Sequence, residues 1–297
     1  MSQLIPITTT RLGEHLPLLD LLPDSQPLAW VRSGEGLVGW GIYATTTVSG
    51  PHRFADARHW WQKQLEKLAV TNTVHGSGTG PVLFTSFSFS PDDVSVLVIP
   101  QVVVGTKSGK SWITWIGSDP QPVLKTAPDH VSNGAMSWNE QPAADEAWKS
   151  RVATAVARIQ NGDLDKVVLA RDITVTSTKS IDPRAILNRL ADEYPTTWKY
   201  SISGLVGATP ELLLRLSRGM VTSRVLAGTI SKTGDDAKDL ALAASLARSS
   251  KDLAEHEYAV RSVAEAIEPF CSSTNVPASP IVLHLANVMH LATDVTG

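Results

Sequence analysis

The chain has 297 residues, of which 42% are hydrophobic and 19% are charged, and its formal net charge is −3. This composition suits a globular protein with a substantial core, and it excludes the strongly basic balance of a nucleic-acid-binding or anionic-membrane-binding protein. The single cysteine, Cys271, excludes a disulfide within the chain and fits a reducing compartment.

Neither a signal peptide nor a membrane span is expected. The stretch from Met1 to Leu22 is interrupted by Arg11 and Asp20, and it has no basic start followed by a continuous apolar run. The longest apolar stretch, Val94 to Val104, contains Pro100 and is too short to cross a bilayer. We therefore expect a soluble, cytoplasmic protein with no membrane or nucleic-acid partner.

The first half of the chain alternates strand-like and helix-like patterns. Runs rich in Val, Ile, Thr and Trp predict strands over Val38–Val48, Val94–Gly105 and Ser111–Ile116. Apolar residues at helical spacing among charges predict a helix over Ala55–Val70.

The second half opens with a predicted helix over Ala144–Gln160, which Asn161-Gly162 ends. Further helices are expected over Pro183–Tyr194, Ala237–Ala247 and Leu253–Phe270. Strands are expected over Lys166–Leu169, Ile173–Thr178, Tyr200–Val206, Leu212–Leu216 and Met220–Leu226. Arg218-Gly219 is a plausible hairpin turn between the last two strands.

Strands that follow one another this closely favour antiparallel pairing over repeated strand-helix-strand units. We therefore predict an α+β fold with large, mostly antiparallel sheets packed face to face and helices outside. Residues 1–297 are expected to form a single domain. Within it, residues 144–297 carry all the candidate motifs, and residues 1–143 carry none that is diagnostic.

Two segments carry a titratable group that could do chemistry. Lys166 heads an apolar run, where its stem can extend along a sheet edge with the ammonium in water. In an enclosed site, burial would instead lower its pKa from about 10.4 and make it a usable base. Glu211 follows the turn Gly207–Pro210, where it either faces solvent or points inward as a proton donor with a raised pKa.

Two further segments could bind a ligand or a metal. Leu226–Thr229 ends a strand with small residues, which let backbone N–H groups approach an anion, although such tetrapeptides are common. Asp252 and Glu255 fit a capping box for the following helix, with Asp252 as N-cap and Glu255 at N3. Alternatively, Glu255 is a ligand for Mg²⁺, a metal that keeps waters and substrate oxygens in its shell.

The order of these segments is more informative than any one of them. Lys-Val-Val-Leu-Ala-Arg, Gly-Ala-Thr-Pro-Glu, Leu-Ala-Gly-Thr, Asp-x-x-Glu-His and Val-Met-His-Leu-Ala-Thr follow one another along the chain. This succession resembles the chorismate-binding enzymes, a family that includes isochorismate, salicylate, anthranilate and aminodeoxychorismate synthases. The resemblance is firm from about Ala144 to Gly297 and loose before it.

The resemblance implies the layered chorismate-binding enzyme fold and the activity of an Mg²⁺-dependent isochorismate synthase, which is an isomerase acting on chorismate. By its motif, Lys166 would be the base that activates water for attack at C2, and Glu211 the acid that protonates the departing C4 hydroxyl. The motifs further match Glu255 to a magnesium ligand, and Asp252, one turn earlier, is a weaker candidate for the outer shell of that ion. They match three residues to substrate contacts, namely Gly228, Thr229 and His290.

Within the family, Lys166 argues against the anthranilate synthase branch, and Ala227 argues against the aminodeoxychorismate synthase branch. The same motifs do not separate isochorismate synthase from salicylate synthase, nor a menaquinone pathway from a siderophore pathway. Because family members continue beyond the His-Leu motif, we expect a chain ending at Gly297 to lack a C-terminal segment with a second magnesium carboxylate. Such a chain, expected to be a monomer, would turn over chorismate poorly.

Two alternatives stay open beside the enzyme. One is a non-catalytic fragment of the same fold. The other is a binding module, in which Lys166 and the acids at 252 and 255 have only structural roles.

Overall fold

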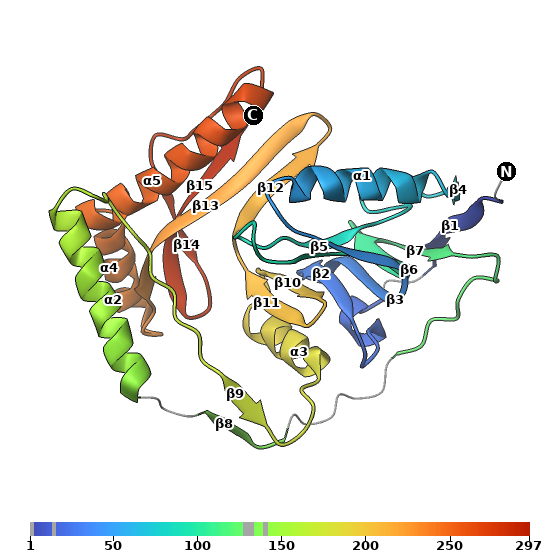
Figure 1. The fold of residues 1–297 in the computed structure, drawn as a ribbon, viewed down its shortest axis with the longest axis horizontal. Coiled ribbons are helices and arrows are strands. Elements are labelled where there is room, and N and C mark those ends of the chain that lie inside the picture. The colour runs from blue at the N-terminus through green and yellow to red at the C-terminus, as the bar shows by residue number, and fades with distance from the viewer. Residues whose placement is uncertain (1–2, 14–15, 127–133, 139–141) are drawn as a thin grey trace.

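The computed structural model describes residues 3–13, 16–126, 134–138 and 142–297. Strands and helices alternate in an α+β fold, which confirms the predicted fold class (Figure 1). In chain order the elements are β1 Ile5–Leu12, the 3-10 helix η1 Leu18–Leu21, β2 Leu28–Arg32, β3 Glu35–Val48, α1 Arg53–Leu65, β4 Leu68–Asn72, β5 Phe84–Ser86, β6 Ser95–Lys107, β7 Lys110–Ile116, β8 Met136–Trp138, α2 Pro142–Gln160, β9 Val175–Ser177, α3 Pro183–Glu193, β10 Trp198–Ile202, β11 Leu205–Thr209, β12 Leu212–Ser217, β13 Met220–Ser231, α4 Asp236–Leu246, α5 Ser250–Ile267, the 3-10 helix η2 Glu268–Phe270, β14 Ile281–His284 and β15 Val288–Thr296.

The larger sheet has nine strands in the order β11-β10-β2-β3-β6-β7-β1-β4, with β5 paired to β6. Every pairing in it is antiparallel except that of β1 with β4. Trp60 and Trp61 of α1 pack against Ile7 and Ile99 of the sheet. On another part of the sheet, Leu187 of α3 is fully buried in a second core cluster.

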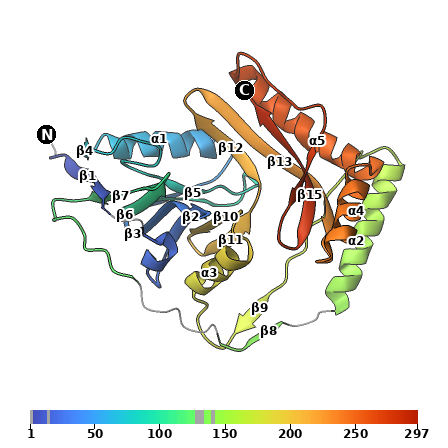
Figure 2. The ribbon, with the colours of Figure 1, turned by 180° about the vertical axis from the view of Figure 1, so that it is seen from behind.

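The smaller sheet has four antiparallel strands in the order β12-β13-β15-β14. Helix α5 packs against Val225 and Val295, and helix α4 against Met289 and Leu291. Figures 1 and 2 show both helices on the side of this sheet that faces away from the nine-stranded sheet. Helices α4 and α5 therefore lie outside the smaller sheet, as predicted.

A cleft of about 470 Å³ lies where the two sheets meet. Trp30 and Trp198 of the larger sheet stack on each other at one wall, and Leu212 and Leu214 of β12 line the other. Between the sheets the chain needs only the two residues Pro210 and Glu211 to pass from β11 to β12.

Several predicted boundaries are wrong in an instructive way. The helix predicted over Ala55–Val70 ends at Leu65, because residues from Leu68 onward pair with β1 as strand β4. The single strand predicted over Tyr200–Val206 is instead a hairpin. Ser203 and Gly204 both have positive φ there, which is the geometry of a tight two-residue turn. The turn predicted at Arg218-Gly219 is confirmed, since Ser217 pairs with Met220.

The strand predicted over Lys166–Leu169 is also wrong. Residues 164–174 carry no strand assignment, and of Ile173–Thr178 only β9 is a strand. A β-strand is defined by its ladder, and no described strand pairs with residues 164–174. Among the described residues, no helix is long and apolar enough to cross a membrane.

The β13–β15 pair is strengthened by an ion pair on directly opposite residues. Arg224 donates from Nε and Nη2 to the two carboxylate oxygens of Asp294, at 2.7 and 2.6 Å. These hydrogen bonds lower the pKa of Asp294 below its ordinary value. A carboxyl with a depressed folded-state pKa stabilises the fold above its unfolded pKa, and the contribution is lost as pH falls through the folded value.

We predict that Asp294→Asn lowers the free energy of unfolding at pH 7 by about 1 kcal/mol, because one charge-assisted hydrogen bond is lost at a partly exposed site. The difference from the unsubstituted chain should begin to shrink below about pH 4, where the carboxyl of the unfolded chain becomes protonated, and should be lost fully only below the depressed pKa of the folded state. Urea unfolding at pH 7 and pH 3.5 measures both effects. Glu146→Gln, which breaks an exposed pair with Lys149, is the control. An Asp294→Asn effect no larger than the control at pH 7 would contradict the assignment.

Candidate active site

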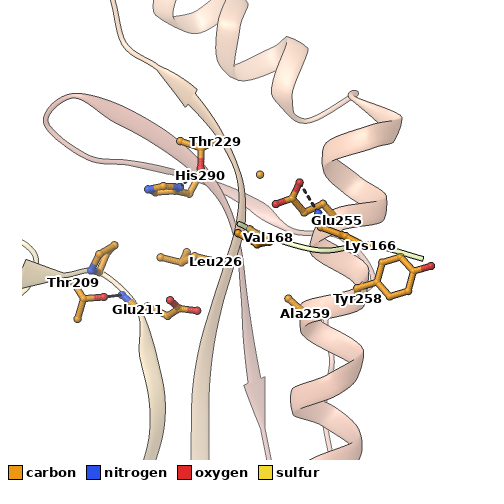
Figure 3. Close-up of a pocket in the computed structure, with 13 residues that line it drawn as sticks. Lys166, Val168, Thr209, Glu211, Leu226, Thr229, Glu255, Tyr258, Ala259 and His290 are labelled. Carbon is orange, nitrogen blue, oxygen red and sulfur yellow. Dashed lines mark hydrogen bonds and ion pairs between the residues drawn. The ribbon is translucent and has the colours of Figure 1, made fainter. Parts of the chain in front are cut away.

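A cavity of about 490 Å³ opens beside β13 of the smaller sheet and the first turns of α5 (Figure 3). Its walls come from the irregular segment 164–174, the turn before β12, the end of β13, the first turns of α5, and β15. The lining residues are Lys166, Val168, Thr209, Pro210, Glu211, Leu226, Ala227, Gly228, Thr229, Glu255, Tyr258, Ala259 and His290.

All six residues singled out from the sequence line this one cavity. Lys166, Glu211 and Glu255 come from three segments that are far apart along the chain, and Gly228, Thr229 and His290 line the same cavity. The structure thus brings the candidate residues together, and their chemical roles stay predictions.

Gly228 allows α5 to approach β13 closely. Its φ is +78°, and a Cβ built on it would lie 3.1 Å from Cβ of Asp252 on α5. The pairing of β13 with β15 shifts register between Ala227 and Thr229, so the strand bulges at this glycine. Only a residue without a side chain satisfies both the left-handed backbone and the close helix.

The capping box of α5 differs from the predicted one. Ser249 is the N-cap, its hydroxyl accepts from the backbone N–H of Asp252, and the Asp252 carboxylate accepts from that same hydroxyl. The helix begins three residues earlier than expected, so the assignment of Asp252 as N-cap and Glu255 at N3 is wrong. Glu255 consequently stands one turn inside α5, where its carboxylate is not used for capping.

The carboxylate of Glu255 forms an ion pair with Lys166, whose Nζ lies 2.7 Å from Oε2. Both side chains are 29% exposed. Lys166 therefore neither follows a sheet edge into water nor sits alone in an apolar enclosure. Its charge is directed at the one carboxylate predicted to bind a metal (Figure 3).

Glu211 lies on the opposite side of the cavity from Lys166 in Figure 3. Its backbone N–H donates to Oγ1 of Thr209 at 3.1 Å, which fixes the turn that leads into β12. The residue is exposed, so the turn directs it to the cavity without burying its carboxyl. The enclosure expected for Glu211 is thus not found in the described part of the chain.

His290 and Thr229 form a pair across β13 and β15. Oγ1 of Thr229 lies 2.9 Å from Nδ1 of His290, and the two residues are opposite each other in the ladder. Burial lowers the pKa of His290, and the negative charge of Glu211 partly opposes this. The imidazole is therefore neutral at pH 7 and can offer either a donor or an acceptor to a ligand.

Two residues of α5 were not singled out as site residues from the sequence. Tyr258 lines the cavity one helical turn after Glu255, and this i, i+3 spacing is the signal that could have found it. His256 is only 3% exposed, and its Nε2 lies 2.7 Å from Oγ1 of Thr293 on β15. That contact depends on where α5 lies on the sheet, which no local pattern reveals.

The donor set at the cavity suits a metal shared between protein and substrate. Among the described residues there is no group of three or more His, Cys, Asp or Glu side chains that could hold a metal. Glu211 and Glu255 are the two carboxylates that line the cavity, and the carboxylate of nearby Asp252 is engaged by Ser249. One carboxylate with substrate oxygens and waters is a usual environment for Mg²⁺.

Comparison with known proteins gives consistent matches. Residues 29–297 match the family model described as "Chorismate binding enzyme". The isochorismate synthase DhbC of Bacillus subtilis is 34% identical over 254 residues, covering 80% of this chain and 60% of that protein. The isochorismate synthase EntC of Escherichia coli K12 is 30% identical over 244 residues, covering 80% of this chain and 59% of that protein.

The solved structure of MenF, the menaquinone-specific isochorismate synthase of Escherichia coli, superimposes with a TM-score of 0.75 at 19% identity. That match covers 99% of this chain and 71% of the other, and it supports the fold. The chain thus spans about 60% of the length of the curated relatives that it matches.

We predict that Gly228→Ala destabilises the chain more than Gly219→Ala. Both glycines have φ near +80°, so both variants bear the cost of about 1–2 kcal/mol for a left-handed alanine. Only at Gly228 would the new methyl also meet α5, whereas Gly219 has no atom within 4 Å of a built Cβ. Urea unfolding measures the difference. Equal losses for the two variants would show that the helix does not depend on this contact.

Proposed function

The chain belongs to the chorismate-binding enzyme family, and from this premise we propose that it carries the base, the acid and a metal ligand of an isochorismate synthase. One observation supports the proposal above all. Lys166, Glu211 and Glu255, which the family motifs match to these three roles, line a single cavity although they come from distant segments. We also propose that both sheets belong to one chorismate-binding domain.

In the proposed reaction the ring gains a hydroxyl group at C2 and loses the one at C4. Water attacks C2 of chorismate and gives a proton to Nζ of Lys166, while the C4 hydroxyl departs as water with a proton from Glu211. One water enters and one leaves, so chorismate and isochorismate have the same composition. The placement of Lys166 and Glu211 on opposite sides of the cavity suits a base and an acid acting at two ends of the ring.

Glu255 would hold Mg²⁺ from the protein side. When bound, the ion would offset the charge of the substrate carboxylate and help to orient it. Thr229, the neutral His290 and the backbone at Gly228 would then contact the polar groups of the substrate from the strand side. The small residues at this strand end leave room for such an approach.

For Lys166 to accept a proton, its ammonium has to leave Glu255 and lose a proton to solvent, and the neutral amine then faces the cavity. The ion pair is partly exposed, and such pairs contribute only about 0.2–1 kcal/mol. Its rupture is therefore a small cost beside the transition-state stabilisation that a positioned base supplies, commonly 10²-fold to 10⁴-fold in rate.

The test is chromatographic detection of isochorismate from chorismate and Mg²⁺. The 297-residue chain is assayed alone, and together with the part of Bacillus subtilis DhbC that lies outside its match to this chain. We expect little turnover by the chain alone and measurable turnover by the pair. Lys166→Ala and Glu211→Gln should each reduce the rate at least about 100-fold, because each removes a proton-transfer group.

Lys149→Ala, at an exposed position on α2, is the matched control and should leave the rate unchanged. Salicylate as the product would replace the proposed reaction with that of a salicylate synthase. Unchanged turnover in both Lys166→Ala and Glu211→Gln would refute the assigned roles.

A further inference from the structure

We propose that Lys166 is an internal cation that competes with the divalent metal for Glu255, so that metal binding and release of the lysine amine are one event. The proposal rests on the proposed function, since it takes Glu255 as the metal ligand. It adds a relation between two site residues that their separate roles do not require.

The geometry places the ammonium where a metal would be bound. Nζ of Lys166 lies 2.7 Å from Oε2 of Glu255, which is hydrogen-bonding distance for a charged pair. Among the described residues, Lys166 has no second carboxylate within ion-pair distance, and Glu255 has no second cation. Each charge therefore depends on the other for neutralisation.

A metal and the ammonium would share one carboxylate, whose single negative charge cannot neutralise both cations. Mg²⁺ binds carboxylate oxygens at about 2.0–2.1 Å, so a metal on Glu255 would stand a few ångströms from an ammonium left in place. Two positive charges at that separation repel each other strongly in a half-enclosed cavity. Binding of a metal at Glu255 would therefore favour a position of Lys166 nearer the cavity, where Glu211 and the substrate space lie.

The backbone around Lys166 permits this displacement. Residues 164–174 form no strand, so no ladder of backbone hydrogen bonds has to break when the lysine moves. The ion pair is also weak enough to yield. A partly exposed pair corresponds to a factor of about 1.4 to 5 in an equilibrium constant, which a divalent ion can readily overcome.

Direct metal binding tests the competition without any assay of activity. The probe is Mn²⁺, a paramagnetic substitute whose free fraction is read by electron paramagnetic resonance at constant pH in the absence of chorismate. Lys166→Met removes the competing charge and keeps an apolar stem of similar length, so Mn²⁺ should bind about fivefold more tightly. Lys166→Arg keeps a cation and should bind Mn²⁺ no more tightly than the unsubstituted chain.

Two controls separate this proposal from the proposed function. Lys149→Met makes the same charge change on the exposed face of α2 and should leave Mn²⁺ affinity unaltered. Glu255→Gln should weaken Mn²⁺ binding at least tenfold. If Glu255→Gln has no effect, the metal assignment itself is overturned, and with it the competition. If Glu255→Gln weakens binding but Lys166→Met does not tighten it, the competition alone is overturned.

A zero-length cross-link gives a second, independent measurement. A carbodiimide joins a lysine and a carboxylate that are in contact, and peptide mapping quantifies the Lys166–Glu255 amide. Added Mg²⁺ should suppress this product several-fold. The Lys149–Glu146 pair, at 2.8 Å, provides an internal control in the same sample and should be unaffected. A Lys166–Glu255 yield that does not fall with Mg²⁺ relative to the control would overturn the proposal.

Discussion

The cavity depends on how closely helix α5 approaches strand β13. The approach is made at Gly228, where a side chain would meet Asp252, and it is held by the buried contact of His256 with Thr293 on β15. Because the helix lies this near, its second turn carries Glu255 to the same cavity as the end of β13. A glycine with positive φ and a buried histidine thus determine where the carboxylate stands.

Strand β15 serves the core and the cavity at once through the two-residue period of a strand. Met289 and Leu291 are fully buried under α4, whereas His290 between them lines the cavity. A one-residue slip of β15 against β13 would exchange these faces. The bulge at Gly228 shifts the register by one residue and so places Thr229 opposite His290. The register of this pair is therefore part of the site.

Much of the fold could be predicted because its determinants are local. Helix α3 begins where Asp182 accepts from the N–H of Arg184, and Arg218-Gly219 provides the positive φ angles of a hairpin turn. The predictions that were wrong have a nonlocal cause. Strand β4 exists because β1 lies beside it, and Lys166–Leu169, with the composition of a strand, has no described strand to pair with.

The same distinction between local and nonlocal determinants applies to the candidate site. Its residues were found because five motifs occur in the order known from one family, whereas taken singly each had an ordinary structural explanation. The sequence pattern could not show which cap begins α5, because Ser249 and Asp252 both suit the N-cap position. Nor could it show that Lys166 and Glu255 touch, since 89 positions separate them and the contact depends on the path of an irregular segment.

That irregular segment gives the cavity two mechanically different walls. Gly228, Thr229 and His290 are held by a continuous ladder and by packing, which make their positions costly to change. Residues 164–174 are tied by ion pairs, Lys166 to Glu255 and Arg171 to Asp145 of α2 at 2.6 Å, and each pair contributes at most about 1 kcal/mol. A ligand or a metal that offers either pair a better partner can therefore move this wall and leave the other in place. The base proposed for the reaction lies on the wall held by ion pairs, and the groups proposed to orient the substrate lie on the wall held by the strand ladder.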